Sequence, residues 1–340
     1  MTNPLDRSTR LVTVFGGSGF VGRHVVRALA QRGWRIRVAC RRPDLAFHLQ
    51  PIGKVGQIHA VQANLRYPAS VASAVHGAEA VVNLVGILTE SGRQRFDAVH
   101  GFGANVVARA AKAAGAASLI QMSAIGADAE SASSYARSKA QGEAAARNSY
   151  ADATIIRPSI VFGPEDDFFN RFAALARLSP VLPLIGGGAT KFQPVYVGDV
   201  AEAIARVLDG QAAGKTLEAG KTWELGGPEV RTFRELLEFI CTTIGRKRLL
   251  LPMPFPLARA QAFGSEIANA VSLGLYPKIL HMTRDQVTLL QTDNVVSEAA
   301  KAAGLTLEGM GIEADSIEAI VPTYLYRFRK SGQFEARATA

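Results

Sequence analysis

Two side chains in the first half of the sequence have the types and spacing needed for proton transfer. Tyr135 and Lys139 are four residues apart, so they share one face of the helix that is expected to begin near Ser134. An unperturbed phenol has a pKa of about 10 and needs an adjacent cation to act near neutral pH. Lys139 supplies that cation, and the pair therefore indicates general acid–base chemistry.

A glycine-rich turn near the N-terminus indicates phosphate binding. Gly16, Gly19 and Gly22 are spaced three residues apart, between an apolar run and a helical pattern. In such a turn the first glycine permits a tight bend, the second lets the backbone approach a pyrophosphate, and the third lets helix and strand pack closely. The N–H groups at the helix start attract phosphate. The turn predicts a dinucleotide site whose candidates here are Gly16, Gly19, Phe20, Val21, Gly22 and Arg23.

The residues after the next strands predict which dinucleotide binds. The second strand is followed by Arg41 and Arg42, where an NAD-preferring site usually carries an acidic residue. Guanidinium groups can bind a 2′-phosphate through charged hydrogen bonds, which favours NADPH; the alternative is that both arginines are solvated surface residues. Further candidates are Asn64 and Leu65, which are expected to border the adenine, and Val85 and Gly86, which are expected to line the nicotinamide ribose.

Strand-like and helix-like segments alternate through about the first 160 residues. Apolar runs expected as strands cover 11–15, 35–40, 58–62, 80–85, 118–122 and 154–156. Helical patterns begin at Val21 and end at Gly33, extend over 99–114, and begin again near Ser134. This order predicts an α/β fold with a Rossmann-type, doubly wound parallel sheet and a smaller C-terminal α/β domain.

The composition of the chain changes after Pro158. We predict an NADPH-binding Rossmann domain over 10–160, its sheet completed by parts of 190–230, and a smaller domain for partner or membrane contact over 161–330. Helices are expected over 200–208 and 233–244, and a strand over 223–225. Three prolines at alternate positions in 252–256 predict that 249–256 is apolar and extended, neither helix nor central strand.

Composition excludes several classes of protein. The chain has 340 residues, of which 48% are hydrophobic and 20% charged, as in globular proteins. No apolar run is long enough for a transmembrane helix, and the polar start lacks a secretory signal pattern. Two distant cysteines argue against a disulfide framework, and the six histidines show no ligand spacing, so no metal site is expected.

A formal net charge of +9 favours an anionic partner, unless it reflects only an arginine-rich surface. Arg246, Lys247 and Arg248 precede the apolar 249–263 segment. They fit an anionic membrane surface, a docking face for other subunits, or the charged edge of an ordinary buried segment. A short tail with Tyr324, Tyr326 and Phe328 among basic residues could anchor a neighbour, while no basic–aromatic interleaving indicates nucleic acid.

Taken together, these motifs resemble the extended and atypical short-chain dehydrogenase/reductase superfamily over about residues 10–325. The resemblance rests on the glycine turn, Ser123, the segment from Tyr135 to Lys139, the Arg157-Pro158 pair and the segment 194–200. It implies that Tyr135 is the general acid/base, that Lys139 lowers its pKa and holds the ribose, and that Ser123 polarises a carbonyl. It also assigns Pro158 and Ile160 to the cofactor site.

A narrower resemblance is to the NADPH-binding accessory subunit of respiratory complex I (NADH:ubiquinone oxidoreductase), in its bacterial form. The segments 47–57, 251–256 and 282–287 carry it. It implies NADPH that is held and not turned over, and partners at the junction of the peripheral arm and the membrane domain. It also implies a peripheral location on the cytoplasmic face of the inner membrane. Ala124, where related enzymes often carry a hydroxyl residue, leaves Tyr135, Lys139 and Ser123 as ribose-binding or vestigial groups.

Two other functions stay open at this point. The Tyr135–Lys139 motif also fits a free-standing NAD(P)H-dependent oxidoreductase or sugar-nucleotide epimerase. The net charge alone would fit a Rossmann protein that binds RNA.

Overall fold

The computed structural model describes residues 10–212, 219–272, 276–277, 279–330 and 332–334. The chain divides into two compact units. The first comprises Met1–Pro158, Val197–Leu225 and Val296–Glu313, and the second comprises Ser159–Tyr196, Gly226–Val295 and Ala314–Ala340.

The first unit is built on a seven-stranded sheet in the order β11-β6-β5-β4-β1-β2-β3. All its neighbouring strands run parallel. The strands are β1 (Leu11–Phe15), β2 (Arg35–Cys40), β3 (Ile58–Gln62), β4 (Ala80–Asn83), β5 (Ser118–Met122), β6 (Thr154–Pro158) and β11 (Thr222–Leu225). The strand order reverses between β1 and β4, which is where doubly wound sheets bind ligands. The predicted Rossmann-type fold is confirmed.

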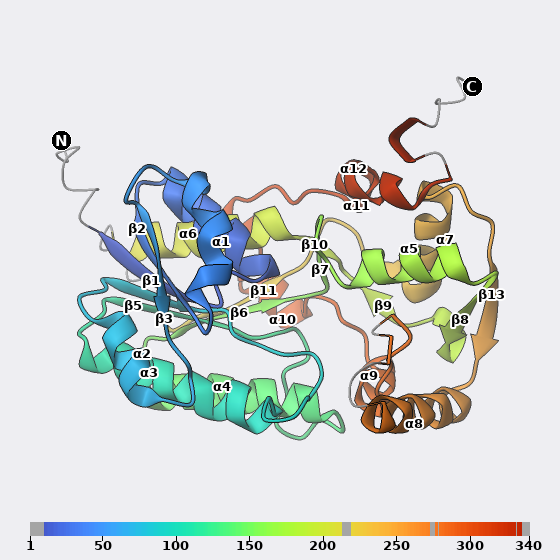
Figure 1. The fold of residues 1–340 in the computed structure, drawn as a ribbon, viewed down its shortest axis with the longest axis horizontal. Helices are drawn as coiled ribbons and strands as arrows, with labels where there is room; N and C mark the ends of the chain where they lie inside the picture. Colours follow the sequence, from blue (N-terminus) through green and yellow to red (C-terminus); the bar gives the residue numbers. More distant parts are fainter. Residues whose placement is uncertain (1–9, 213–218, 273–275, 278, 331, 335–340) are drawn as a thin grey trace. The chain divides into compact units, whose positions relative to one another are not determined.

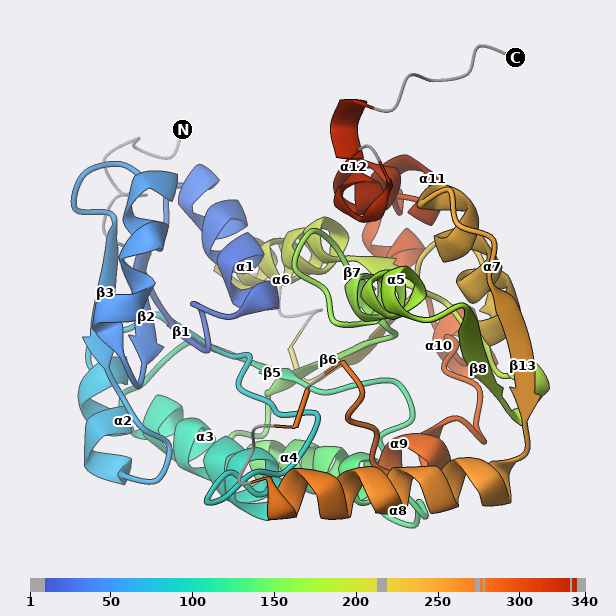
Figure 2. The ribbon, with the colours of Figure 1, turned by 45° about the vertical axis from the view of Figure 1, so that its right-hand side comes forward.

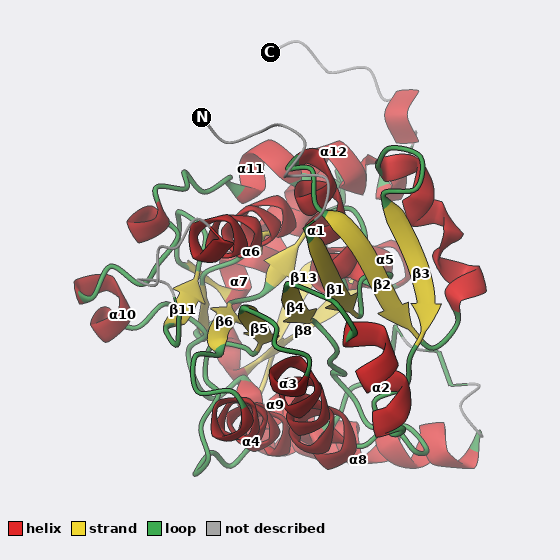
Figure 3. Cartoon of the chain, turned by 90° about the vertical axis from the view of Figure 1, so that its left-hand side faces the viewer, coloured by secondary structure: helices red, strands yellow, loops and turns green. Residues whose placement is uncertain are grey.

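Helices cover both faces of this sheet (Figures 1 and 3). On one face lie α1 (Phe20–Gln31) and α6 (Val197–Ala212), and on the other lie α2 (Pro68–Val75), α3 (Gly103–Ala113) and α4 (Ser134–Ser149). Apolar side chains from the sheet and from α2 and α3 form one buried core, which includes Phe15, Val81 and Leu119. A ten-residue 3-10 segment, η2 (Pro43–Ile52), follows β2.

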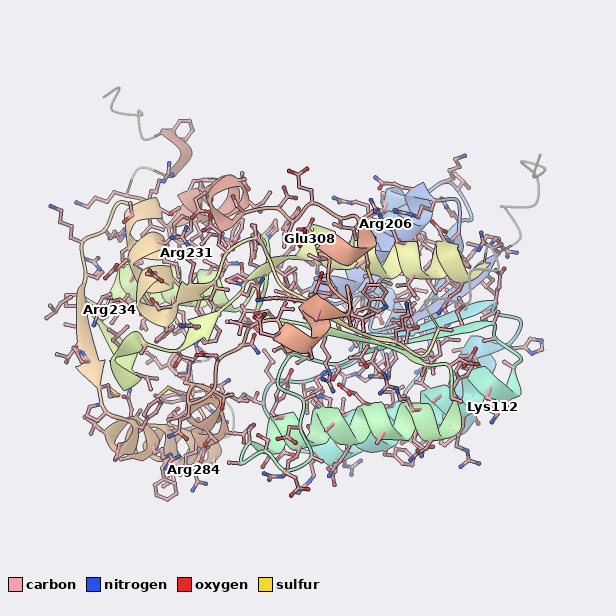
Figure 4. The ribbon with its side chains drawn as sticks, turned by 180° about the vertical axis from the view of Figure 1, so that it is seen from behind. Lys112, Arg206, Arg231, Arg234, Arg284 and Glu308 are labelled. Carbon is pink, nitrogen blue, oxygen red and sulfur yellow. The ribbon has the colours of Figure 1, made fainter. Side chains whose placement is uncertain are left out.

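The segment that returns to the first unit after residue 295 is fixed by hydrogen bonds. It carries α10 (Glu298–Ala302) and the 3-10 turn η6 (Glu308–Met310). Arg206 on α6 donates to the carbonyls of Met310 and Gly311, and Figure 4 labels Arg206 and Glu308 at this place. The backbone N–H of Ser297 donates to Glu224 on β11, at 2.8 Å.

The start of the helix expected over 99–114 differs from the prediction. Residues Asp97–Phe102 form a π-helical turn, η3, before α3 begins. Close packing accompanies this turn: a Cβ on Gly103 would lie 2.8 Å from Leu65 Cδ1, and a Cβ on Gly142 would lie 2.7 Å from the carbonyl oxygen of His100. The prediction missed the turn because apolar periodicity does not distinguish a π turn from an α turn.

The second unit has helices around three small sheets. Its helices are α5 (Phe168–Leu178), α7 (Phe233–Thr243), α8 (Phe255–Val271), α9 (Arg284–Leu289), α11 (Ile317–Ile320) and α12 (Pro322–Leu325). Its strand pairs are β7 (Val161–Phe162) with β10 (Val195–Tyr196), β8 (Val181–Ile185) with β13 (Leu249–Met253), and β9 (Lys191–Phe192) with β12 (Arg231–Thr232). Buried phenylalanines dominate its core, among them Phe162, Phe169 and Phe233.

Two expectations for this part of the chain are corrected. The segment 249–256 is not extended throughout: β13 pairs with β8, and α8 begins at Phe255 after a sharp turn (Figure 2). A two-stranded sheet has only edge strands, which tolerate Pro252. Pro256 lies in the first turn of α8, where its missing N–H has no intrahelical partner to lose.

The expected aromatic tail is partly core. Tyr324 is buried, and its hydroxyl donates to Asp166 at 2.6 Å. The same carboxylate accepts from the backbone N–H groups of Phe169 and Gly163. Tyr324 therefore stabilises its own unit and does not extend toward a neighbour.

Candidate functional site

The glycine turn occupies the space between β1 and α1, at the reversal of the strand order. Gly16 has a positive φ of 76°, and a Cβ there would lie 3.2 Å from the carbonyl carbon of Leu84, just after β4. A Cβ on Gly22 would lie 2.2 Å from the carbonyl oxygen of Gly16, so α1 could not pack against the turn. Gly19 is exposed, so its backbone is accessible to a ligand, and a Cβ there would lie 3.3 Å from the carbonyl oxygen of Gly16. This cradle fits a pyrophosphate at the start of α1.

The side chains at the start of α1 frame this cradle. Phe20 and Val21 are partly exposed, and the Phe20 ring meets His24 edge-on at 6.0 Å between centroids. Arg23 is partly buried one turn further along α1. The described first turn of α1 has no acidic residue and no side-chain cap, so the electrostatic field there favours an anion.

The two arginines after β2 are both exposed. Arg42 forms an ion pair with Asp44 at 2.7 Å, and this hydrogen bond lowers the pKa of the Asp44 carboxyl. Asp44, which is not among the residues predicted for the site, places a carboxylate close to the end of β2. The region thus holds two guanidinium groups and one carboxylate.

The candidates after β3 and β4 have different surroundings. Asn64 accepts a hydrogen bond from the N–H of Arg66, and Leu65 packs on the apolar core under α3. Val85 N–H donates to the side chain of Asn83 at 3.2 Å. Gly86 is exposed, and a Cβ there would lie 3.3 Å from Lys139 Nζ. The structure therefore brings Gly86 together with Lys139, while Leu65 serves packing.

Tyr135 and Lys139 share one face of α4, as predicted. Lys139 is buried, and its Nζ lies 5.7 Å from the centroid of the Tyr135 ring. Burial raises the pKa of Tyr135 to about 12 and lowers the pKa of Lys139 to about 8. The resemblance implied that Lys139 lowers the pKa of Tyr135, and in this structure desolvation dominates instead.

Ser123, just after β5, is buried and directs its hydroxyl to a carboxylate. Its Oγ donates to Glu143 Oε1 at 2.5 Å. Arg157 on β6 donates two hydrogen bonds to the same carboxylate, from Nε at 2.8 Å and from the terminal nitrogen at 2.7 Å. Because this bidentate ion pair requires the carboxylate form of Glu143, the proton between Ser123 and Glu143 belongs to Ser123. The Ser123 hydroxyl proton is therefore already engaged in a hydrogen bond within the protein.

Glu143, Arg157 and His100 were not recognised from the sequence as parts of this site. Glu143 follows Lys139 by four residues on α4, so helical spacing alone could have placed it on the same face. His100 lies 38 residues from its partner Ser138, and no local pattern predicts that contact.

Two further candidates lie where the chain leaves the first unit. Pro158 is the last residue of β6, and its carbonyl accepts from the N–H of Ile125 at 3.0 Å. Ile160 belongs to the second unit and packs against its phenylalanine-rich core.

Neither a metal centre nor a membrane span is found among the described residues. Within them, no three His, Cys, Asp or Glu side chains form a group that could hold a metal ion. None of their helices combines the length and apolar character that crossing a bilayer requires.

Comparison with known proteins identifies the family. Residues 12–226 match the NAD dependent epimerase/dehydratase family. The chain is 35% identical over 326 residues to NADH dehydrogenase (ubiquinone) 1 alpha subcomplex subunit 9, mitochondrial, of Arabidopsis thaliana; the match covers 95% of this chain and 79% of that protein. It is 31% identical over 302 residues to the ceramide reductase of Caulobacter vibrioides, covering 87% of this chain and 89% of that protein.

A solved structure shares the fold. The NADPH-dependent quinone oxidoreductase of Escherichia coli, complexed with NADPH, superimposes with a TM-score of 0.68 at 22% identity, covering 93% of this chain and 99% of that one. The resemblance seen in the sequence is thereby confirmed: the chain belongs to the NAD(P)-binding NAD dependent epimerase/dehydratase family, of the extended short-chain dehydrogenase/reductase type, and subunit 9 of mitochondrial NADH dehydrogenase is its homologue.

Proposed function

We propose that this chain is an accessory subunit of respiratory complex I that binds NADPH and does not turn it over. Its similarity to subunit 9 of the plant mitochondrial enzyme extends over 95% of the chain and therefore includes both units. The partners are subunits at the junction of the peripheral arm and the membrane domain.

The observation that supports the absence of turnover is the hydrogen bond from Ser123 to Glu143. A serine hydroxyl has one proton, and a serine polarises a carbonyl substrate by donating that proton to it. Ser123 donates that proton to a carboxylate held by Arg157, and Ala124 supplies no second hydroxyl. Burial also raises the pKa of Tyr135 to about 12, away from the range suited to acid–base catalysis at neutral pH.

The same residues are suited to holding a cofactor. Bound NADPH supplies hydride chemistry, and this chain's residues bind and orient it. Gly16, Gly19 and Gly22, with the start of α1, receive the pyrophosphate, and Tyr135 with Lys139 receives the nicotinamide ribose. Arg41 and Arg42 hold the 2′-phosphate, which is the reason for NADPH in place of NADH. A ligand bound only by the native state stabilises it by about 4 kcal/mol at a thousandfold excess over its Kd.

The second unit supplies contacts with partners and with the membrane surface. On α8 the buried face consists of Ala258, Ala262 and Ser265. The same helix exposes four large apolar side chains, Leu257, Phe263, Ile267 and Val271. Arg284 lies over the Phe263 ring at 5.0 Å, and Figure 4 labels it in this region. Arg284 also pairs with Glu266 on α8, at 2.8 Å. Exposed apolar side chains on one helix are typical of helices that lie on a bilayer surface. Together with the proposed membership in complex I, these side chains favour a peripheral location, for which we propose the cytoplasmic face of the bacterial inner membrane.

The decisive experiment is gentle extraction of the protein from its own membranes, followed by native separation and identification of the bound nucleotide. Comigration with complex I subunits, with about one NADPH per chain, is expected. A free monomer or dimer without those subunits would overturn the proposal. For the membrane contact, flotation with anionic vesicles should be lost in Ile267→Glu and kept in the matched control Leu178→Glu, whose leucine is exposed elsewhere in the same unit.

A reductase is the second candidate function. The similarity to a bacterial ceramide reductase over 89% of that protein favours it, as does the presence of both Tyr135 and Lys139. This candidate predicts NADPH consumption with a carbonyl substrate, including long-chain lipid ketones, that is abolished in Tyr135→Phe. If none of the carbonyl substrates tested is reduced, the accessory role is favoured.

A further inference from the structure

His100 is a buried side chain at the candidate site for which the proposed function gives no role. It lies on the π-helical turn η3, with 3% of its surface exposed. Its Nε2 lies 3.1 Å from the backbone nitrogen of Ile87, in the loop after β4, and its Nδ1 lies 2.8 Å from Ser138 Oγ on α4. The imidazole ring therefore links the loop after β4 to helix α4.

The hydrogen bonds define the tautomer of this ring. The N–H of Ile87 can only donate, so Nε2 accepts and carries no proton. A neutral ring then carries its proton on Nδ1 and donates it to Ser138 Oγ. Ser138 is free to accept because its own proton goes to the carbonyl of Tyr135, at 2.7 Å. Burial and nearby Lys139 lower the pKa of His100 to about 3, so the neutral form persists near neutral pH.

Two aromatic side chains pack against the His100 ring. Phe96 stacks on it with centroids 5.5 Å apart, and Tyr135 meets it edge-on at 5.7 Å. The carbonyl oxygen of His100 lies so close to α4 that a Cβ on Gly142 would approach it to 2.7 Å. A Cβ on Gly86 would lie 3.5 Å from His100 Nε2 and 3.3 Å from Lys139 Nζ. The loop after β4 thus contacts His100 and Lys139 together.

We propose that His100 is a positioning residue: it fixes the loop 84–87 against Tyr135 and Lys139 and so shapes the nicotinamide end of the cofactor site. The hydrogen bond from the N–H of Ile87 to Nε2 fixes the position of the loop, and the hydrogen bond to Ser138 fixes the orientation of the ring relative to α4. The inference rests on the proposed cofactor site and is independent of membership in complex I. Because the contacts lie at one end of that site, His100 should not affect binding of the adenosine half.

Two substitutions separate the contacts of the ring. In His100→Asn the side-chain amide reaches the position of Nδ1 and can donate to Ser138 Oγ, but it is too short to accept from the N–H of Ile87. In His100→Gln the amide oxygen reaches the position of Nε2 and can accept from the N–H of Ile87. Loss of one hydrogen bond corresponds to about tenfold weaker binding. The expected result is that NADPH binds about tenfold more weakly to His100→Asn and nearly normally to His100→Gln.

Calorimetric titration of the full chain with NADPH and with 2′,5′-ADP provides the test, since the second probe lacks the nicotinamide ribose. His100→Asn should bind 2′,5′-ADP as the wild type does, a result that general destabilisation would not give. Equal losses for both nucleotides, or unchanged NADPH binding, would overturn the role of His100 while leaving the proposed cofactor site intact. Wild-type protein that binds neither nucleotide would overturn both. If His100→Asn does not fold, Ser138→Ala removes the hydrogen bond that orients the ring relative to α4 and should weaken NADPH binding selectively.

Discussion

Removing the positive charge of Arg157 should destabilise the first unit more than any change to a surface ion pair. Arg157 holds Glu143 through two hydrogen bonds and lies 3.5 Å from Glu224. The two carboxylate side chains are only 7% and 11% exposed. Arg157→Met keeps the aliphatic length of the side chain and leaves two nearly buried carboxylates without their cation.

The size of the effect follows from this burial. Breaking a buried ion pair by removing one partner costs about 3–5 kcal/mol. The Arg157 side chain is 25% exposed, so solvent screens part of the interaction and the lower end applies. We expect a loss of about 3 kcal/mol, which lowers the Tm of a unit of this size by about 6–12 °C.

Tryptophan fluorescence can follow this unit selectively. The chain has two tryptophans, Trp34 and Trp223, and both are buried in the first unit. Urea unfolding of the wild type and of Arg157→Met would give the difference in free energy. Arg95→Met is the matched control, because its ion pair with Asp97 is solvent-exposed and should contribute nothing measurable.

A double variant tests the physical reason. In Arg157→Met, Glu143→Gln the uncompensated charge on residue 143 is gone, so at least half of the lost stability should return. If the single variant loses less than about 1 kcal/mol, or if the double variant is less stable than the single one, the reasoning is refuted.

Four other predictions concern the glycine turn, the second unit, Lys139 and the arginines. Gly22→Ala should cost at least about 3 kcal/mol, because its Cβ would lie 2.2 Å from a backbone oxygen, whereas Gly101→Ala, which meets nothing within 4 Å, should leave thermal unfolding unchanged. Tyr324→Phe should cost about 2 kcal/mol in circular-dichroism melts, since Asp166 loses a donor while buried; an unchanged melt would contradict this. The lowered pKa of Lys139, about 8 when folded against about 10.4 when unfolded, means that the unfolded chain binds more protons between those values. Stability should therefore rise by about 2 kcal/mol from about pH 8 to about pH 10, relative to Lys139→Met at the same pH values. Arg41→Ala with Arg42→Ala should weaken NADPH binding by about 10–100-fold and NADH binding by less than about threefold; equal losses would argue against a 2′-phosphate site.

Local sequence patterns were sufficient for most of the sheet. The strands 11–15, 35–40, 58–62 and 118–122 have the expected limits, because each contains closely spaced apolar residues. The glycine spacing located the turn after β1 because Gly22 is required by the packing of α1 on its own strand. The position of Tyr135 and Lys139 on one helical face also follows from spacing alone.

The start of α8 was decided by context. Pro254 and Pro256 disfavour the interior of a helix, yet as N-cap and first-turn residues they begin one. Likewise, Pro252 is compatible with β13 because that strand has a single neighbour. A proline restricts the backbone in a way that depends on its position in an element, and the sequence does not specify that position.

The chemical state of the site was decided by tertiary structure. Ser123 and Glu143 are 20 residues apart in the chain, Arg157 and Glu143 are 14 apart, and His100 and Ser138 are 38 apart. Sequence patterns place a serine, a tyrosine and a lysine at one edge of the sheet. Only the folded chain determines that the serine proton goes to Glu143, that desolvation outweighs the charge of Lys139 at Tyr135, and that His100 stays neutral. Each outcome depends on distances and burial that arise when separate elements pack, because electrostatic and hydrogen-bond energies depend on three-dimensional separation and not on position along the chain.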